Sequence, residues 1–155
     1  MTTPQNTYEA IVVGTDGSER AGIAVRHALS LAKLTGAKVH VVHAYHSGGG
    51  PMSFPHDYEG RLTTDRMLEE ANRIREQALA DAERAGVTAE VHDLSEDPAD
   101  GIINVATSVG ADLVVVGNRG MTGAKRFVLG SVPNAIAHKC PCSVLIVSTD
   151  SAPTA

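Results

Sequence analysis

The chain has 155 residues, a formal net charge of −5 and only 3% aromatic residues. This length is typical of one domain, so we expect a single domain over residues 1–155 with flexible tails at about 1–7 and 149–155. Scarce aromatic side chains and an acidic balance argue against a nucleic-acid partner. No apolar run approaches about 18 residues, and residues 1–6 lack a basic, apolar leader, so we expect no membrane span and a cytoplasmic location.

The first half of the chain alternates short apolar runs with helical patterns. Strands are predicted at 10–13, 39–45 and 87–94. Between the first two, small and branched apolar residues recur at helical spacing from Ala21 to Ala32, with Asp16 or Ser18 as the helix cap and Gly36 at its end. Residues 47–60 are predicted to be a loop, either a solvated connection or a flap over a ligand. The following helix has an apolar stripe and an expected Glu69–Arg73 ion pair; the stripe consists of Met67, Ala71, Ile74, Ala78 and Ala82.

The second half continues the same alternation. Asp97-Pro98 is typical of a helix start, and Gly110 of a helix end. The run 113–116 is apolar without alternation, which indicates a strand buried on both faces. A helix over about 132–139 and a strand over 143–147 complete the pattern. The order βαβαβαβαβ predicts an α/β fold, a parallel sheet with helices on both faces.

Two glycine-rich segments follow strands, at Gly14-Thr-Asp-Gly-Ser18 and from Gly117 through Gly130-Ser131. A buried strand that ends in glycines and continues as a helix presents unpaired backbone N–H groups, which bind phosphate. In an open parallel sheet, ligands bind at the carboxyl ends of strands where the strand order reverses. If the first and fourth strands are neighbours there, both segments face one crevice.

The charge distribution favours a small anionic ligand. Residues 113–149 contain no Asp or Glu but carry Arg119, Lys125, Arg126 and Lys139, a local charge of +4 that leaves −9 on the rest of the chain. A positive patch on an acidic protein suits a small anion better than a polymer.

Several other sites are excluded by their missing motifs. The chain has no GxxxxGK[ST], no GxGxxG after the first strand, no GxSxG and no HExxH. His40, His43 and His46 recur three apart, but strand residues alternate faces, so His43 lies opposite the other two and no metal site is expected. Cys140 and Cys142 lack the CxxC spacing and are predicted to be reduced thiols.

The glycine pattern resembles that of a known family. Gly117-x2-Gly120-x9-Gly130-Ser131 is similar to the nucleotide-binding signature of universal stress proteins that bind ATP. The first glycine loop and the fourth and fifth strands also resemble that family, so the similarity covers roughly residues 8–148.

The resemblance implies a Rossmann-like five-stranded parallel sheet of order 3-2-1-4-5, ATP as the ligand with or without Mg²⁺, and a homodimer through the last strand at 143–147. That strand would be an apolar edge without charges, which favours pairing. Asp16 and the backbone of the first loop would meet adenine or ribose, and the second loop would hold ribose and phosphates. The implied binding residues are Gly14, Thr15, Asp16, Ala44, Val116, Gly117, Asn118, Arg119, Gly120, Met121, Thr122, Gly123, Gly130, Ser131 and Val132.

These features predict an ATP-binding regulatory protein of the stress response. We identify no catalytic residues, because no paired carboxylates or water-positioning group accompany the phosphate loops, and we expect at most slow hydrolysis. Three alternatives remain: cyclic AMP in the same site, a nucleotide-independent dimeric interaction module, and an adenylating enzyme, although the SGGxDS and HIGH-type motifs of such enzymes are absent.

Overall fold

The computed structural model describes residues 8–45, 58–118 and 129–150. Its nine elements run in the order β1 (Ala10–Gly14), α1 (Glu19–Thr35), β2 (Lys38–Ala44), α2 (Tyr58–Ala85), β3 (Ala89–Leu94), α3 (Pro98–Val109), β4 (Leu113–Gly117), α4 (Ser131–Lys139) and β5 (Ser143–Val147). The predicted alternation is confirmed. The loop expected at 47–60 ends earlier than predicted, because α2 begins at Tyr58. The choice between a solvated connection and a flap over a ligand falls on residues that lie outside the described ranges.

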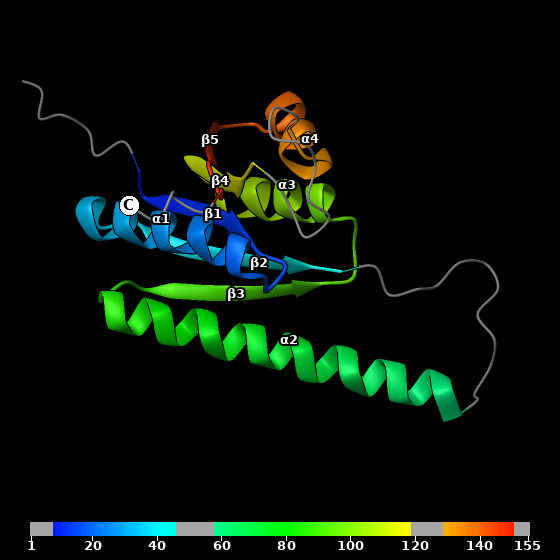
Figure 1. Ribbon diagram of the computed structural model, residues 1–155. Coiled ribbons are helices and arrows are strands. Elements are labelled where there is room, and N and C mark those ends of the chain that lie inside the picture. Colours follow the sequence, from blue (N-terminus) through cyan, green and yellow to red (C-terminus); the bar gives the residue numbers. More distant parts are fainter. Residues whose placement is uncertain (1–7, 46–57, 119–128, 151–155) are drawn as a thin grey trace, which may run out of the picture.

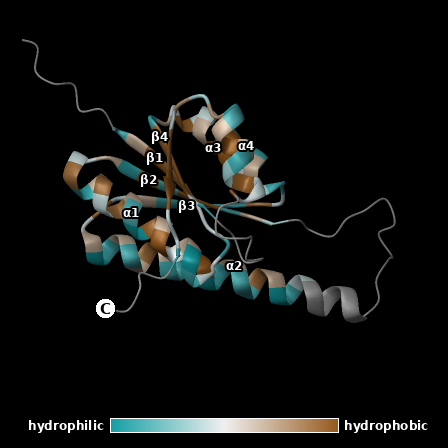
Figure 2. Ribbon diagram, turned by 45° about the horizontal axis from the view of Figure 1, so that its top comes forward, coloured by the Kyte–Doolittle hydropathy of each residue, from teal (hydrophilic) through white to brown (hydrophobic). Residues whose placement is uncertain are grey.

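The five strands form one parallel sheet in the order β3-β2-β1-β4-β5, which confirms the expected topology. Helices α1 and α2 cover one face, and α3 and α4 cover the other (Figure 1). The central strands β1 and β4 are apolar along their length and lie between these layers (Figure 2). Leu113 through Val116 are buried, as expected for a strand covered on both faces.

Local signals set most helix ends. Gly36 and Gly110 adopt the left-handed conformation after α1 and α3, with φ of 78° and 62°, as glycine does at helix ends. Asp97 caps α3, and its carboxylate accepts from the N–H of Ala99 at 3.0 Å. The choice between Asp16 and Ser18 is settled in favour of Ser18, whose hydroxyl accepts from Ala21 N–H at 3.2 Å.

The long helix α2 packs through its stripe of small and branched residues. Ala71, Ile74, Ala78 and Ala82 are buried, whereas Met67 is partly exposed. The predicted Glu69–Arg73 pair is wrong: Arg73 pairs with Glu70, at 2.6 Å between Nη2 and Oε1. Both spacings place the two residues on one side of a helix, so the helical pattern alone does not choose between them.

The C-terminal end of the described chain is anchored. Thr149 is 2% exposed, and both its backbone N–H and its hydroxyl donate to Asn118 Oδ1 at 2.9 Å. The tail expected to be flexible from residue 149 therefore does not begin at Thr149. Residues 1–7 and 151–155, the rest of the expected tails, lie outside the described residues.

Candidate functional site

The two glycine-rich segments meet where the strand order reverses. From β1 the chain continues to β2 on one side, and β4 lies on the other side of β1. A cleft of about 250 Å³ opens at the carboxyl ends of these strands. Its described lining comes from both segments, from the carboxyl ends of β2 and β4 and from the beginnings of α1, α3 and α4; it consists of Gly14, Thr15, Asp16, Ala21, Val42, Ala44, Pro98, Ile102, Val116, Gly117, Gly130, Ser131, Val132 and Pro133.

The wall that follows β1 is shaped by short-range hydrogen bonds. Thr15 N–H donates to the carbonyl of Val42 at 2.9 Å, which ties the loop to β2. Thr15 Oγ1 accepts from Gly17 N–H at 3.1 Å. Asp16 Oδ1 accepts from Ser18 N–H at 2.9 Å, so the Asp16 carboxylate braces the turn while Ser18 caps α1. These bonds hold the Asp16 carboxylate at the cleft before any ligand arrives.

The opposite wall is the amino end of α4. Gly130 occupies the N-cap position without a side-chain hydrogen bond to the helix, and Ser131 is the first helical residue. The first backbone bond of this turn runs from Asn134 N–H to the Gly130 carbonyl at 3.1 Å. The N–H groups of Ser131 and Val132 precede that bond, and such groups, together with the helix dipole, attract anions.

Asn118 holds together the two ends of the segment that connects β4 to α4. Its carbonyl accepts from Gly130 N–H at 2.9 Å, and its own N–H donates to the carbonyl of Val147 at 2.9 Å. Its side-chain oxygen accepts both bonds from Thr149. The described residues that line the cleft do not include Asn118. Asn118 therefore stabilises the position of Gly130, at the start of α4, without itself lining the cleft.

The inner surface of the cleft is mostly apolar, with Val42, Ala44, Ile102 and Val116 among its lining residues. Two glycines allow this close packing. A Cβ on Gly14 would lie 2.5 Å from Ile102 Cδ1, and a Cβ on Gly101 would lie 3.2 Å from Ala44 Cβ. The missing side chain of Gly14 therefore makes room for the side chain of Ile102.

Nine of the predicted residues lie on the cleft lining: Gly14, Thr15, Asp16, Ala44, Val116, Gly117, Gly130, Ser131 and Val132. Arg119, Gly120, Met121, Thr122 and Gly123 lie outside the described residues. Sequence reasoning missed five lining residues, Ala21, Val42, Pro98, Ile102 and Pro133. The Asp97-Pro98 helix start was a usable signal for Pro98, because every helix of such a sheet begins at the carboxyl edge of the strands.

The two cysteines lie away from the cleft, around the start of β5. Their sulfur atoms are 3.6 Å apart and are not bonded. Burial, followed by the neighbouring Cys140, raises the pKa of the Cys142 thiol to about 12. A thiol with such a pKa stays protonated at neutral pH, which is typical of an inert structural cysteine. Within the described ranges, we find no helix long and apolar enough to cross a membrane.

Comparison with known proteins gives one consistent result. Residues 7–148 match the model of the universal stress protein family. A universal stress protein of Methanocaldococcus jannaschii is 32% identical over 143 residues, which cover 92% of this chain and 84% of that protein. The universal stress protein YxiE of Bacillus subtilis is 31% identical, with 90% and 99% covered.

Solved structures agree with the sequence matches. A universal stress protein in complex with cAMP is 33% identical, with a TM-score of 0.70, and the alignment covers 92% of this chain and 98% of that one. The universal stress protein of Archaeoglobus fulgidus in complex with dAMP is 29% identical, with a TM-score of 0.65 and coverage of 92% and 99%. With the family model matching nearly the whole chain, and the sheet order and cleft described above, the chain belongs to the universal stress protein family.

Proposed function

We propose that this chain is an adenine-nucleotide-binding regulatory protein of the stress response, with ATP as its ligand in the cleft between β1 and β4. The observation that carries the proposal is the amino end of α4 on the cleft lining, where Ser131 and Val132 present backbone N–H groups and Ser131 adds a hydroxyl. Relatives solved with cAMP and dAMP support an adenine nucleotide as the ligand class.

The two parts of the cleft suit the two parts of a nucleotide. The apolar surface near Ala44 and Val116 would cover adenine and ribose, with Asp16 and the backbone of residues 14–16 at their polar edges. The α4 terminus would hold phosphate, and Gly117 and residues 118–123 would extend this contact along the ribose and phosphates. Mg²⁺ would arrive with the phosphates, and Asp16 is the one carboxylate among the described lining residues that could meet it.

The same lining argues for binding rather than catalysis. Asp16 is the only ionisable side chain among the described residues of the cleft. Its carboxylate already accepts a backbone hydrogen bond, and a hydrolase needs a second group to position or deprotonate water. We therefore propose at most slow ATP hydrolysis, with the bound or free state as the signal, in the cytoplasm.

Cyclic AMP is the second candidate, because a relative 33% identical to this chain was solved with it. The sequence favours ATP: Arg119, Lys125 and Arg126 follow Gly117, and a triphosphate gains more from three cations than the single charge of cyclic AMP does. Calorimetric titration with each ligand decides between them. Tighter binding of cyclic AMP would contradict the choice of ATP.

The decisive experiment is to denature freshly purified protein and identify any released nucleotide by chromatography and mass. We expect ATP or its hydrolysis product. A protein that releases no nucleotide and also binds neither ATP nor cyclic AMP in calorimetry would contradict the proposal and favour a nucleotide-independent interaction module.

We also propose that the protein forms a homodimer through β5. This strand pairs with β4 on one side and is the edge of the sheet, and its Ile146 is 37% exposed. An apolar edge strand with open backbone groups recruits another strand. A charge at this edge, in Ile146→Lys, should give a monomer in light scattering, whereas the control Leu34→Lys on α1, at an 83% exposed position, should remain dimeric. A monomeric wild type would contradict the dimer.

A further inference from the structure

Three side chains with metal-binding atoms converge on the two outermost strands at the β3 edge. His40 comes from β2, and Glu90 and His92 come from β3. In the register of these parallel strands, His40 lies opposite Glu90, and His92 lies two residues further along, opposite Val42. Because alternate residues share a face, all three side chains lie on the sheet face that α3 and α4 cover.

The distances among these atoms are close to those of a metal-ligand set. His40 Nδ1 lies 3.0 Å from His92 Nε2 and 3.9 Å from Glu90 Oε2, and His92 Nε2 lies 3.9 Å from Glu90 Oε1. Zinc bonds of about 2.0–2.2 Å at tetrahedral angles place ligand atoms roughly 3.3–3.5 Å apart. Shifts of about half an ångström would therefore close the set around one ion.

The burial of the three side chains gives them different parts in such a site. The side chain of His40 is 7% exposed, that of His92 is 21% exposed and that of Glu90 is 51% exposed. His40 is thus held in place by packing, while Glu90 can move toward an ion that enters from solvent.

A cation already occupies part of this position. Lys38 Nζ lies 2.8 Å from Glu90 Oε2, and both side chains are about half exposed. The Lys38 ammonium group neutralises the carboxylate that a metal ion would use. Ion pairs at this exposure contribute little stability, so a divalent ion bound by two imidazoles can displace the Lys38 side chain.

The cluster is separate from the nucleotide cleft. None of its three residues is among the described residues that line the cleft. His40 precedes Ala44, at the cleft, by four strand residues, which corresponds to roughly 13 Å along β2. A metal ion at this cluster would not be the Mg²⁺ that accompanies a nucleotide.

We propose that His40, Glu90 and His92 form a binding site for one Zn²⁺ ion per chain. Two imidazole nitrogens and one carboxylate oxygen are a ligand set that zinc accepts, with water in the fourth position. The spacing of histidines along β2 alone could not predict this zinc site, because two of the ligands, Glu90 and His92, lie on the neighbouring strand β3.

The test is a calorimetric Zn²⁺ titration of tag-free protein from which metal has been removed. We expect one Zn²⁺ per chain, and His92→Gln should weaken binding at least about tenfold, since even residues behind the ligands contribute 10- to 100-fold. The matched control is His27→Gln, an exposed histidine on α1, which should bind as the wild type does. Zinc should also raise the melting temperature of the wild type but not of His92→Gln, because its ligands join two strands.

A wild type that binds no Zn²⁺, or a folded His92→Gln variant that binds as tightly as the wild type, would overturn the site. Glu90→Gln, at a half-exposed position, replaces His92→Gln if the latter does not fold. A second variant tests the competition: Lys38→Met should tighten Zn²⁺ binding by up to about fivefold, the value of an exposed ion pair. Binding to Lys38→Met that is weaker than to the wild type would contradict competition between Lys38 and the ion for Glu90.

Discussion

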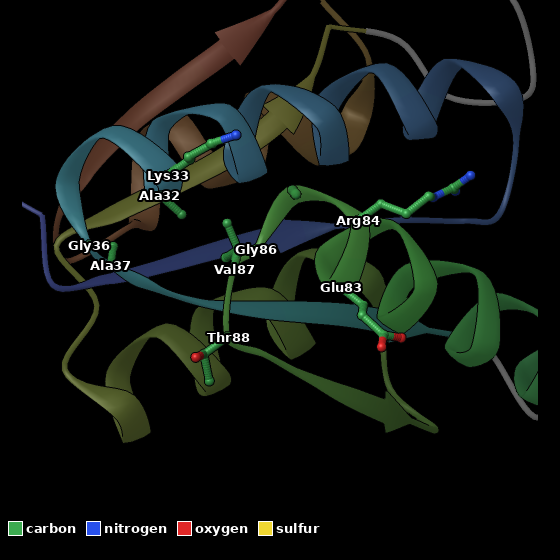
Figure 3. Close-up of a pocket in the computed structure, with 10 residues that line it drawn as sticks. Ala32, Lys33, Gly36, Ala37, Glu83, Arg84, Gly86, Val87 and Thr88 are labelled. Atoms are coloured by element: carbon green, nitrogen blue, oxygen red, sulfur yellow. The ribbon is translucent and has the colours of Figure 1, made fainter.

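One hollow lies at the amino ends of the strands and another at their carboxyl ends, and the larger hollow is less suited to bind a nucleotide. At the amino ends of β2 and β3, a hollow of about 430 Å³ lies between the ends of α1 and α2, whereas the cleft at the carboxyl ends measures about 250 Å³. In the larger hollow, the charged ends of Lys33 and Arg84 point to the same side of the view, and the Glu83 carboxylate points away from them (Figure 3). Arg84 is paired with Asp81 on its own helix.

The two hollows differ in the direction of the helices around them. Helices α1 and α2 end at the larger hollow, which therefore lies at the negative ends of their dipoles, whereas α3 and α4 begin at the cleft. Lys33 and Arg84 lie in the last turns of α1 and α2, where cations offset the dipole. The direction of the helices, rather than the volume of the hollow, therefore determines which end of the strands attracts an anion.

The glycines of the two regions also serve different purposes. Gly36 and Gly86, at the larger hollow, have φ of 78° and 70°, and a Cβ on either would meet open space. Gly130, at the cleft, has φ of −60° and ψ of 163°, which any residue adopts. The first two are thus required by the backbone, whereas the backbone does not require glycine at Gly130.

Of the variants that test this comparison, Gly130→Val is expected to change ATP affinity the most. The added side chain would occupy the start of α4 and remove two charge-assisted N–H contacts, a loss of about 3 kcal/mol or more, or about 100-fold in ATP affinity. Because its backbone conformation suits valine, the unfolding midpoint should change little. ATP affinity equal to that of the wild type in calorimetry would remove the α4 terminus from the binding site.

Ser131→Ala tests the same wall more gently. Loss of one hydroxyl bond to a charged phosphate should weaken ATP binding by about 1.5–3 kcal/mol, which calorimetry measures directly. Ser30→Ala, at an exposed position on α1, is the matched control and should bind ATP as the wild type does. No weakening in Ser131→Ala would show that the hydroxyl does not contact the ligand.

Gly36→Ala should give the smallest effect, and of the opposite kind. Alanine in the left-handed conformation costs about 1 kcal/mol, which should lower the melting temperature by about 2–4 °C. ATP affinity should be unchanged, because Gly36 lies at the amino ends of the strands, away from the cleft. If this variant lost ATP affinity, the distinction between the hollow at the amino ends and the cleft at the carboxyl ends would not hold.

Much of the fold could be predicted because its signals are local. Asp97-Pro98, Gly36 and Gly110 mark helix ends through the conformation of one or two residues, and the apolar run before Gly117 marks a strand buried on both faces. The strand order came from the resemblance, since the order of parallel strands is not encoded in any single segment.

What the sequence could not provide depends on contacts between distant residues. That Gly14 makes room for Ile102, and that Ile102 and Pro98 line the cleft, follows only from how α3 lies on the sheet. Asn118 could be assigned to the binding loop by its position, but its bonds to Thr149 connect residues 31 apart. The pairing of His40 with His92 likewise depends on the register between two strands.

The Asn118–Gly130 bond has a consequence for how this protein can be altered. Because β4 and α4 are joined at these two residues, the chain between them begins and ends at one fixed place. Lengthening a loop whose ends are fixed costs little, about 0.6 kcal/mol for each doubling. Evolution or an engineer could therefore replace the residues between Asn118 and Gly130 while β4, α4 and the described lining of the cleft stay in place.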